Sequence, residues 1–319
     1  MSKQVSNYKT IDLFAGIGGI RIGFEREGFK TVFANDFDEY CKVTYDGYFK
    51  DIPLTVKDIK EVKVEDLPEF DVLLGGFPCQ AFSIAGYRQG FEDTRGRGDL
   101  FFYIANILEK RKPKAFLLEN VKNLVSHDKG KTFKIIMETL TNLGYKVDYR
   151  VLNTYEYGNL PQNRERTYIV GFLDWKHLEN FRFPTKRKLE VAVKDLLEKS
   201  IDEKYYYNGK PLYERIKDGV ISEDSVYQWR RQYVRENKKN ICPTLTANMG
   251  TGGHNVPIVK VKDGIRKLTP RECLRLQGFP EDYPLPDLAD SRIYKQAGNS
   301  VSIPVIQRIA KSMMEVLSS

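Results

Sequence analysis

A strand, a glycine-rich turn and a helix follow one another at the start of the chain, and this order constrains the fold most. The apolar run Thr10 to Phe14 predicts a short buried strand, and Ala15 to Gly19 forms the turn. Ile20 to Glu27 has the spacing of an amphipathic helix that ends near Gly28. Glycines let a backbone turn sharply and approach a ligand, as in nucleotide-binding sheets. We therefore expect an α/β fold with a Rossmann-like sheet.

Acidic residues follow the next two predicted strands. The strand from Lys30 to Asn35 is followed by Asp36, at the ~20-residue offset at which a carboxylate binds ribose hydroxyls, and Phe37 can stack on adenine. Asp58 follows another strand end and can accept from an exocyclic amine. An adenosine pocket of this kind suits a nicotinamide dinucleotide or S-adenosylmethionine. The turn departs from GxGxxG by one residue, which favours the cofactor without a pyrophosphate.

Cys79 stands at the end of a further buried run. The run from Val72 stops at Gly75 and Gly76, and Pro78 stiffens the backbone before the cysteine. A cysteine at a strand end is a candidate nucleophile, although free cysteines are more often small buried apolar residues. A downstream strand ends in Glu119, at the same predicted edge, where a carboxyl group can protonate a ring nitrogen.

Arginines gather in two places near these residues. The glycine-rich stretch from Gln80 to Asp99 holds three arginines that suit phosphate contact, Arg88, Arg95 and Arg97. It is interpreted as a moving loop, with an ordinary surface loop as the alternative. Arg164 and Arg166 are two residues apart, so their side chains point to the same face if that stretch is extended. The alternative is that they form an ordinary network of salt bridges with Glu165 and neighbouring carboxylates.

Composition limits the class of protein. The chain has 319 residues, 41% of them hydrophobic, which suffices for one large domain or for a large and a small one. A net charge of +8 favours a polyanionic partner. The four cysteines are far apart and indicate neither a zinc site nor disulfides, so no metal is expected. No signal peptide or membrane-length apolar run is present in the sequence, so we expect a cytoplasmic protein.

At this point several motifs together carry a resemblance. The chain resembles the C5 cytosine-specific DNA methyltransferases of the bacterial restriction-modification type. The matching motifs occur in the family's order and span nearly the whole chain: Asp12 to Gly19, Gly76 to Ser83, Glu119 to Val121, Gln162 to Arg166, Arg271 to Cys273 with Gln277 to Pro280, and Gln296 to Val301.

The resemblance implies an enzyme that flips a cytosine out of a short double-stranded DNA site and methylates its C5. Cys79 would add to C6, Glu119 would stabilise the ring protonated at N3, and Arg166, with Arg164, would bind the O2 side. The methyl group would come from S-adenosylmethionine. The implied cofactor residues are Phe14, Gly16, Gly18, Gly19, Asp36, Phe37, Asp58, Ile59, Pro78, Leu100, Asn299 and Val301.

The resemblance also implies two domains. Residues 1–180, completed by 287–319, would form the catalytic and cofactor-binding domain, and 181–286 the inserted target recognition domain with its hinge. That region is basic and rich in aromatic residues, which suits contact with double-stranded DNA. We expect a monomer whose DNA-binding residues are Ser83, Arg88, Arg95, Arg97, Arg230, Arg231, Arg235, Thr244, Thr246, Asn248, Gly252 and Gly253.

Three other functions remain open from the sequence. A nicotinamide-dependent oxidoreductase shares the glycine turn but leaves Cys79, Glu119 and the paired arginines without a role. A non-catalytic DNA-binding protein on the same scaffold would not need those residues intact. A tRNA cytosine methyltransferase uses the same catalytic motifs with a different recognition region.

Overall fold

The chain divides into two compact units, each built from separate stretches of sequence. The structure, a computed structural model, describes residues 8–78, 100–251 and 256–319. The first unit contains 1–152, 165–184 and 306–319, and the second contains 153–164 and 185–305. The functional division that we expect, into a catalytic and a recognition domain, stays a prediction.

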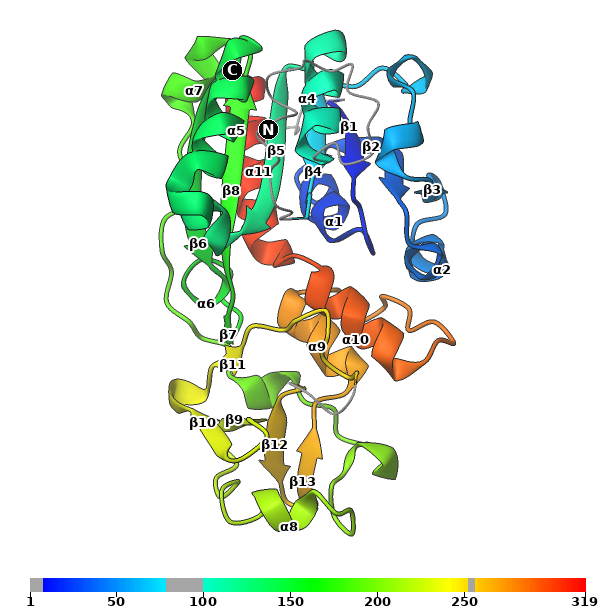
Figure 1. Ribbon diagram of the computed structural model, residues 1–319, viewed down its shortest axis with the longest axis vertical. Helices are drawn as coiled ribbons and strands as arrows, with labels where there is room; N and C mark the ends of the chain where they lie inside the picture. The colour runs from blue at the N-terminus through cyan, green and yellow to red at the C-terminus, as the bar shows by residue number, and fades with distance from the viewer. Residues whose placement is uncertain (1–7, 79–99, 252–255) are drawn as a thin grey trace, which may run out of the picture. The chain divides into compact units, whose positions relative to one another are not determined.

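A seven-stranded sheet forms the centre of the first unit, in the order β3-β2-β1-β4-β5-β8-β6 (Figure 1). The strands β1 to β5 pair in parallel, and β8 runs antiparallel to β5. The expected Rossmann-like α/β fold is confirmed. The strands are β1 (Lys9–Leu13), β2 (Lys30–Asp36), β3 (Thr55–Val56), β4 (Val72–Gly75), β5 (Ala115–Val121), β6 (Lys146–Asn153) and β8 (Glu165–Phe172).

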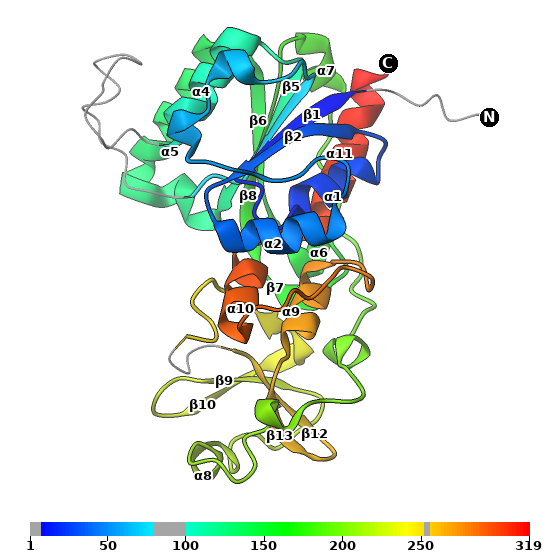
Figure 2. The same ribbon diagram turned by 90° about the vertical axis from the view of Figure 1, so that its right-hand side faces the viewer.

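Helices cover both faces of this sheet. Figure 2 shows α4 and α5 on one side and α1 and α11 on the other. The α1 and α11 helices pack closely, because a Cβ placed on Gly23 would lie 2.5 Å from Ile306 Cγ2. The helices of this unit are α1 (Gly19–Glu25), α2 (Glu39–Tyr48), α4 (Leu100–Arg111), α5 (Lys131–Asn142), α7 (Trp175–Asn180) and most of α11 (Ile303–Leu317).

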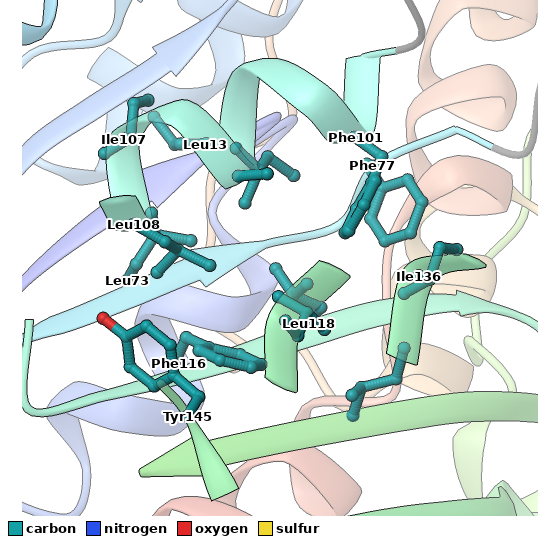
Figure 3. Packing of buried hydrophobic residues seen from close by; sticks show 14 of the residues in the cluster. Leu13, Leu73, Phe77, Phe101, Ile107, Leu108, Phe116, Leu118, Ile136 and Tyr145 are labelled. Carbon is teal, nitrogen blue, oxygen red and sulfur yellow. The ribbon is translucent and has the colours of Figure 1, made fainter. Parts of the chain in front are cut away.

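The main hydrophobic core lies between the sheet and α4 with α5 (Figure 3). Leu13, Leu73 and Leu118 project from the strands onto Phe101 and Leu108 of α4, and all five are fully buried. Burying one such side chain contributes roughly 1.5–3 kcal/mol, so this layer stabilises the packing of β1, β4 and β5 close to their carboxyl ends. Those strand ends carry the predicted site residues.

The second unit contains a four-stranded sheet in the order β10-β9-β12-β13 and a two-stranded pair of β7 and β11. Its strands are β7 (Gln162–Asn163), β9 (Val226–Trp229), β10 (Val234–Asn237), β11 (Cys242–Pro243), β12 (Ile258–Val261) and β13 (Gly264–Lys267). Its helices are α6 (Thr154–Tyr157), α8 (Tyr213–Ile216), α9 (Pro270–Gln277) and α10 (Asp290–Asn299).

Candidate active site

Two neighbouring strands bring an acid and a guanidinium group together. In the antiparallel pairing of β5 and β8, Arg166 lies opposite Val121. Val121 is two residues from Glu119, so the side chains of Glu119 and Arg166 lie on the same face of the sheet. Arg166 Nε lies 3.2 Å from Glu119 Oε1, and the two side chains are only 13% and 10% exposed. Poor access to water strengthens an ion pair of this kind relative to a surface pair. The structure thus brings the candidate acid and the candidate arginine together in an ion pair that was not predicted from the sequence.

The segment that leads to Cys79 borders this ion pair. Asn120 Nδ2 donates a 2.9 Å hydrogen bond to the carbonyl of Phe77, which ties the end of β5 to the chain leaving β4. A Cβ on Gly76 would lie 3.8 Å from Glu119 Oε2. Glu119 thus flanks the backbone just before the predicted nucleophile. Cys79 itself lies outside the described residues, as do Ser83, Arg88, Arg95 and Arg97.

The glycine turn after β1 is held by a carboxylate from β2. Asp36 Oδ2 accepts a 2.8 Å hydrogen bond from the amide of Gly16. Gly16 and Gly18 have φ values of +54° and +81°, a region that favours glycine. A Cβ on Gly18 would lie 2.3 Å from the Phe49 ring, whereas one on Gly16 would meet nothing within 4 Å. Gly18 is therefore needed for packing, and Gly16 faces open space.

The residues around this turn fit an adenosine-containing cofactor. Phe37 follows the end of β2 and is 71% exposed, so its ring is accessible for stacking. Asp58 is exposed and accepts a hydrogen bond from the amide of Lys60, while the side chain of Ile59 is buried. Burial raises the pKa of Asp36 above its ordinary value, although hydrogen bonds from the backbone oppose that shift.

The other predicted cofactor residues are spread over both units. Phe14 and Leu100 are half-buried, Gly19 is buried at the start of α1, and Pro78 is exposed. In the second unit, Asn299 is exposed at the end of α10 and the side chain of Val301 is buried. Their roles in cofactor binding stay predictions.

Arg164 belongs to the second unit and is 2% exposed. Its guanidinium donates to the carbonyls of Leu245 at 2.9 Å and Gly298 at 3.1 Å, and also to that of Ser300. The expected extended stretch shared with Arg166 is interrupted here, because β8 begins at Glu165. All three acceptors are main-chain carbonyls, so the guanidinium of Arg164 is already bound within the protein. We therefore propose only Arg166 as a catalytic arginine.

Sequence reasoning missed a buried charge network beside the glycine turn. Asp12 is fully buried in β1, and neither carboxylate oxygen has a hydrogen-bond partner among the described residues. Burial raises its pKa to about 8, against an opposing effect of Arg21. Arg21 is 1% exposed and pairs with Glu25 at 2.7 Å and Asp51 at 2.6 Å. The sequence feature that could have indicated this network is the position of Asp12 inside an apolar strand.

The predicted DNA-binding residues of the second unit differ in their exposure. Arg230, Arg231 and Arg235 are exposed in and beside the β9–β10 hairpin. Thr244 Oγ1 donates to the carbonyl of Asn163, and Thr246 Oγ1 donates to Asn248 Oδ1 at 2.8 Å. Gly252 and Gly253 lie outside the described residues.

Two other kinds of feature are not formed by the described residues. Among residues 8–78, 100–251 and 256–319, no group of three or more His, Cys, Asp or Glu side chains is arranged to hold a metal ion. No helix in the described part of the chain combines the length and apolar character needed to cross a bilayer.

Relatives of known description align with nearly the whole chain. The type II methyltransferase M.Bsp6I of Bacillus sp. (strain RFL6) is 55% identical over 94% of this chain and 96% of its own length. The type II methyltransferase M.HaeII of Haemophilus aegyptius is 45% identical over 98% of this chain and 95% of its own.

Solved structures share the fold. The Dnmt2 methyltransferase of S. pombe superposes with a TM-score of 0.76 at 19% identity, covering 98% of this chain and 100% of that one. The DNMT2 mutant of Spodoptera frugiperda gives 0.75 at 19% identity, covering 96% and 99%. The family model described as C-5 cytosine-specific DNA methylase matches residues 8–315. With the acid, the guanidinium and the glycine turn arranged as described, this chain belongs to the C-5 cytosine-specific DNA methylase family.

Proposed function

We propose that this protein methylates C5 of one cytosine within a short double-stranded DNA site, as the modification enzyme of a type II restriction-modification system. The observation that carries the chemistry is the ion pair of Glu119 and Arg166 beside the backbone that leads to Cys79. The family match and the relatives named as type II methyltransferases support the substrate and the setting. We further propose that it acts as a monomer in the cytoplasm.

In the proposed mechanism the cysteine makes C5 nucleophilic. The Cys79 thiolate adds to C6, and Glu119 supplies a proton at N3, so that the electron pair from the addition reaches C5. Arg166 holds the O2 side of the ring and fixes the direction of the Glu119 carboxyl group. After C5 is methylated, a base removes its remaining proton, the bond between C6 and sulfur breaks to release Cys79, and N3 returns its proton to the Glu119 carboxylate.

The donor in this proposal is S-adenosylmethionine, which supplies an electrophilic methyl group when bound. Gly16 leaves open space at the turn, Asp36 holds that turn and offers further lone pairs to a ribose, and Phe37 provides an exposed ring for adenine. The full proposed set is Phe14, Gly16, Gly18, Gly19, Asp36, Phe37, Asp58, Ile59, Pro78, Leu100, Asn299 and Val301.

The target cytosine must leave the duplex before Cys79 can reach C6, because the stacked base hides that atom. We propose that the stretch from Gln80 to Asp99 contacts the DNA phosphates through its arginines and that the second unit reads the site. Flipping costs a few kcal/mol, which contacts to the surrounding DNA offset.

The test is transfer of labelled methyl groups from S-adenosylmethionine to unmethylated plasmid DNA, mapped by bisulfite sequencing. We expect methylated cytosines within one short motif, and complete loss of transfer with retained DNA binding in Cys79→Ser. The matched control is Cys41→Ser, because Cys41 is a buried cysteine of α2 outside the site, and it should retain transfer.

Turnover by Cys79→Ser would refute the nucleophile assignment. Transfer to tRNA but not to plasmid would replace the DNA substrate, and DNA binding without any transfer would leave a non-catalytic protein.

A further inference from the structure

The β9–β10 hairpin has two faces with different tasks. Trp229 lies opposite Val234, and both pack on the small core of the second unit, which includes Tyr227. Gln228 lies opposite Arg235 and so shares the other face of the hairpin with it. One face thus anchors the hairpin, and the other presents Gln228 and Arg235. Figure 1 shows β9 and β10 within the second unit.

The polar face lines a hollow of about 630 Å³ that lies wholly within the second unit. Arg230, Arg235 and Gln228 contribute from the hairpin side, and Asn163, Thr244 and Thr246 contribute from the chain around β7 and β11. Glu236 also borders the hollow, and its carboxylate accepts a 2.6 Å hydrogen bond from Ser225 Oγ. The lining therefore carries two cations, one occupied carboxylate and several neutral hydrogen-bonding groups.

Several of these groups have no partner within the described residues. Gln228 is only 7% exposed, yet its side-chain amide makes no hydrogen bond to any described residue. Arg230 and Arg235 form no ion pair with any residue that the structure describes, in contrast to Arg266 and Arg275 of the same unit, which pair with Glu272 and Glu281. A buried amide normally finds a partner, so Gln228 indicates that the hollow is built for a ligand that forms hydrogen bonds. The exposed guanidinium groups of Arg230 and Arg235 add donors that face the same hollow.

We propose that this hollow receives the major-groove edge of a guanine in the recognition site, with Arg235 donating to its O6 and N7 and Gln228 bonding the same base pair. The inference rests on the proposed function, which makes duplex DNA the substrate. A two-stranded ribbon fits the major groove, and guanine alone presents two adjacent acceptors there that match an arginine fork.

Arg231 serves as the internal contrast. It sits in the turn of the same hairpin with φ +66°, is exposed, and does not line the hollow. We assign it to the phosphate backbone, where a positive charge contributes to affinity without reading sequence. The two arginines therefore share one hairpin and differ in what they contact.

Randomised DNA duplexes are selected by binding to wild type, to Arg235→Lys or to Arg231→Lys, and the retained duplexes are sequenced. The base preference at each position is then compared between the three proteins. Both variants keep the positive charge, while lysine lacks the bidentate fork. In Arg235→Lys we expect preference at one guanine position to fall about 10-fold to 100-fold, with the other positions unchanged. Gln228→Ala should weaken the same position, and Arg231→Lys should select the wild-type motif.

An unchanged motif in Arg235→Lys, or an equal reduction of preference at every position, would overturn the guanine assignment. A wild-type protein that selects no motif would overturn it too. Methyl transfer to the selected duplexes is measured separately. A wild type that selects a motif without methylating it refutes the proposed chemistry, while the comparison of the variants still decides the guanine assignment.

Discussion

Asp12 is a carboxyl group in the interior of the sheet whose oxygens have no hydrogen-bond partner among the described residues. Its pKa is raised to about 8 in the folded protein, mainly by burial, whereas in the unfolded chain it has its ordinary value near 4. Between about pH 4 and pH 8 the unfolded chain releases this proton and the folded protein keeps it. We therefore expect Asp12 to lower the free energy of unfolding as pH rises through that range, by up to about 1.4 kcal/mol per pH unit.

Urea denaturation of wild type and Asp12→Asn between pH 5 and pH 8 measures this effect. The variant should lose most of the pH-dependent decline, because its amide does not ionise. Asp66→Asn is the control, since Asp66 is exposed in a short 3-10 helix and should leave the decline in place. Parallel curves for wild type and Asp12→Asn would contradict the argument.

The roles of individual residues could be predicted from the sequence only in part. Glu119 could be predicted to lie at the edge where β4 ends, because a strand end is a local property. The place of Arg166 at that edge could not, because it depends on the antiparallel direction of β8. The ion partners of Arg21 and the carbonyls bound by Arg164 could not, because those partners come from distant segments. The residues next to an arginine in the sequence do not determine which distant main-chain carbonyls its buried guanidinium will bind.

At the scale of elements, the last turn of α10 approaches another segment more closely than a side chain allows. A Cβ on Gly298 would lie 2.2 Å from the carbonyl carbon of Thr246 and 2.6 Å from the nitrogen of Ala247. In Gly298→Ala the gain in helix propensity, up to about 1 kcal/mol, competes with overpacking against backbone, which costs about 1–3 kcal/mol. We expect the overpacking to win and the unfolding midpoint in urea to fall.

The control for that measurement is Ser291→Ala in the same helix, where the side chain is half-buried. It should change the free energy of unfolding by no more than about 0.5 kcal/mol, as partly exposed substitutions generally do. A Gly298→Ala protein as stable as wild type would show that the two segments separate at little cost.

Whole elements were easier to predict than their pairing. The apolar spacing from Leu100 to Lys110 predicts a helix, and the structure has α4 there. Thr269 before Pro270 and Glu272 predicts a helix cap, and the structure places Thr269 as the cap of α9, with Glu272 completing the capping box. The antiparallel direction of β8 was not predicted, because an apolar strand buried on both faces reads the same in either direction. The small sheet of β9, β10, β12 and β13 was also missed, since its strands are short and carry many charged residues.

At the scale of the whole molecule, the net charge of +8 predicts DNA binding that depends on salt. Replacing Arg88, Arg95 and Arg97 together by alanine should reduce the slope of log affinity against log salt by about 0.9 for each phosphate that the variant no longer neutralises. Dissociation constants for one duplex at salt concentrations from about 50 mM to about 200 mM measure that slope. Lys134→Ala is the control, because Lys134 is a highly exposed residue of α5. A slope equal to that of wild type would exclude binding of phosphates by these arginines.

The chain passes between its two compact units at 152/153, 164/165, 184/185 and 305/306. The second unit is therefore not a single cassette, because the short stretch 153–164 carries Gln162 and Arg164, whose side chains bind the longer stretch 185–305. If the second unit reads the DNA site as we propose, grafting a relative's specificity onto this protein requires that both stretches come from the same donor. In a chimera that exchanges only the longer stretch, Gln162 and Arg164 of one protein would have to bind main-chain carbonyls of another.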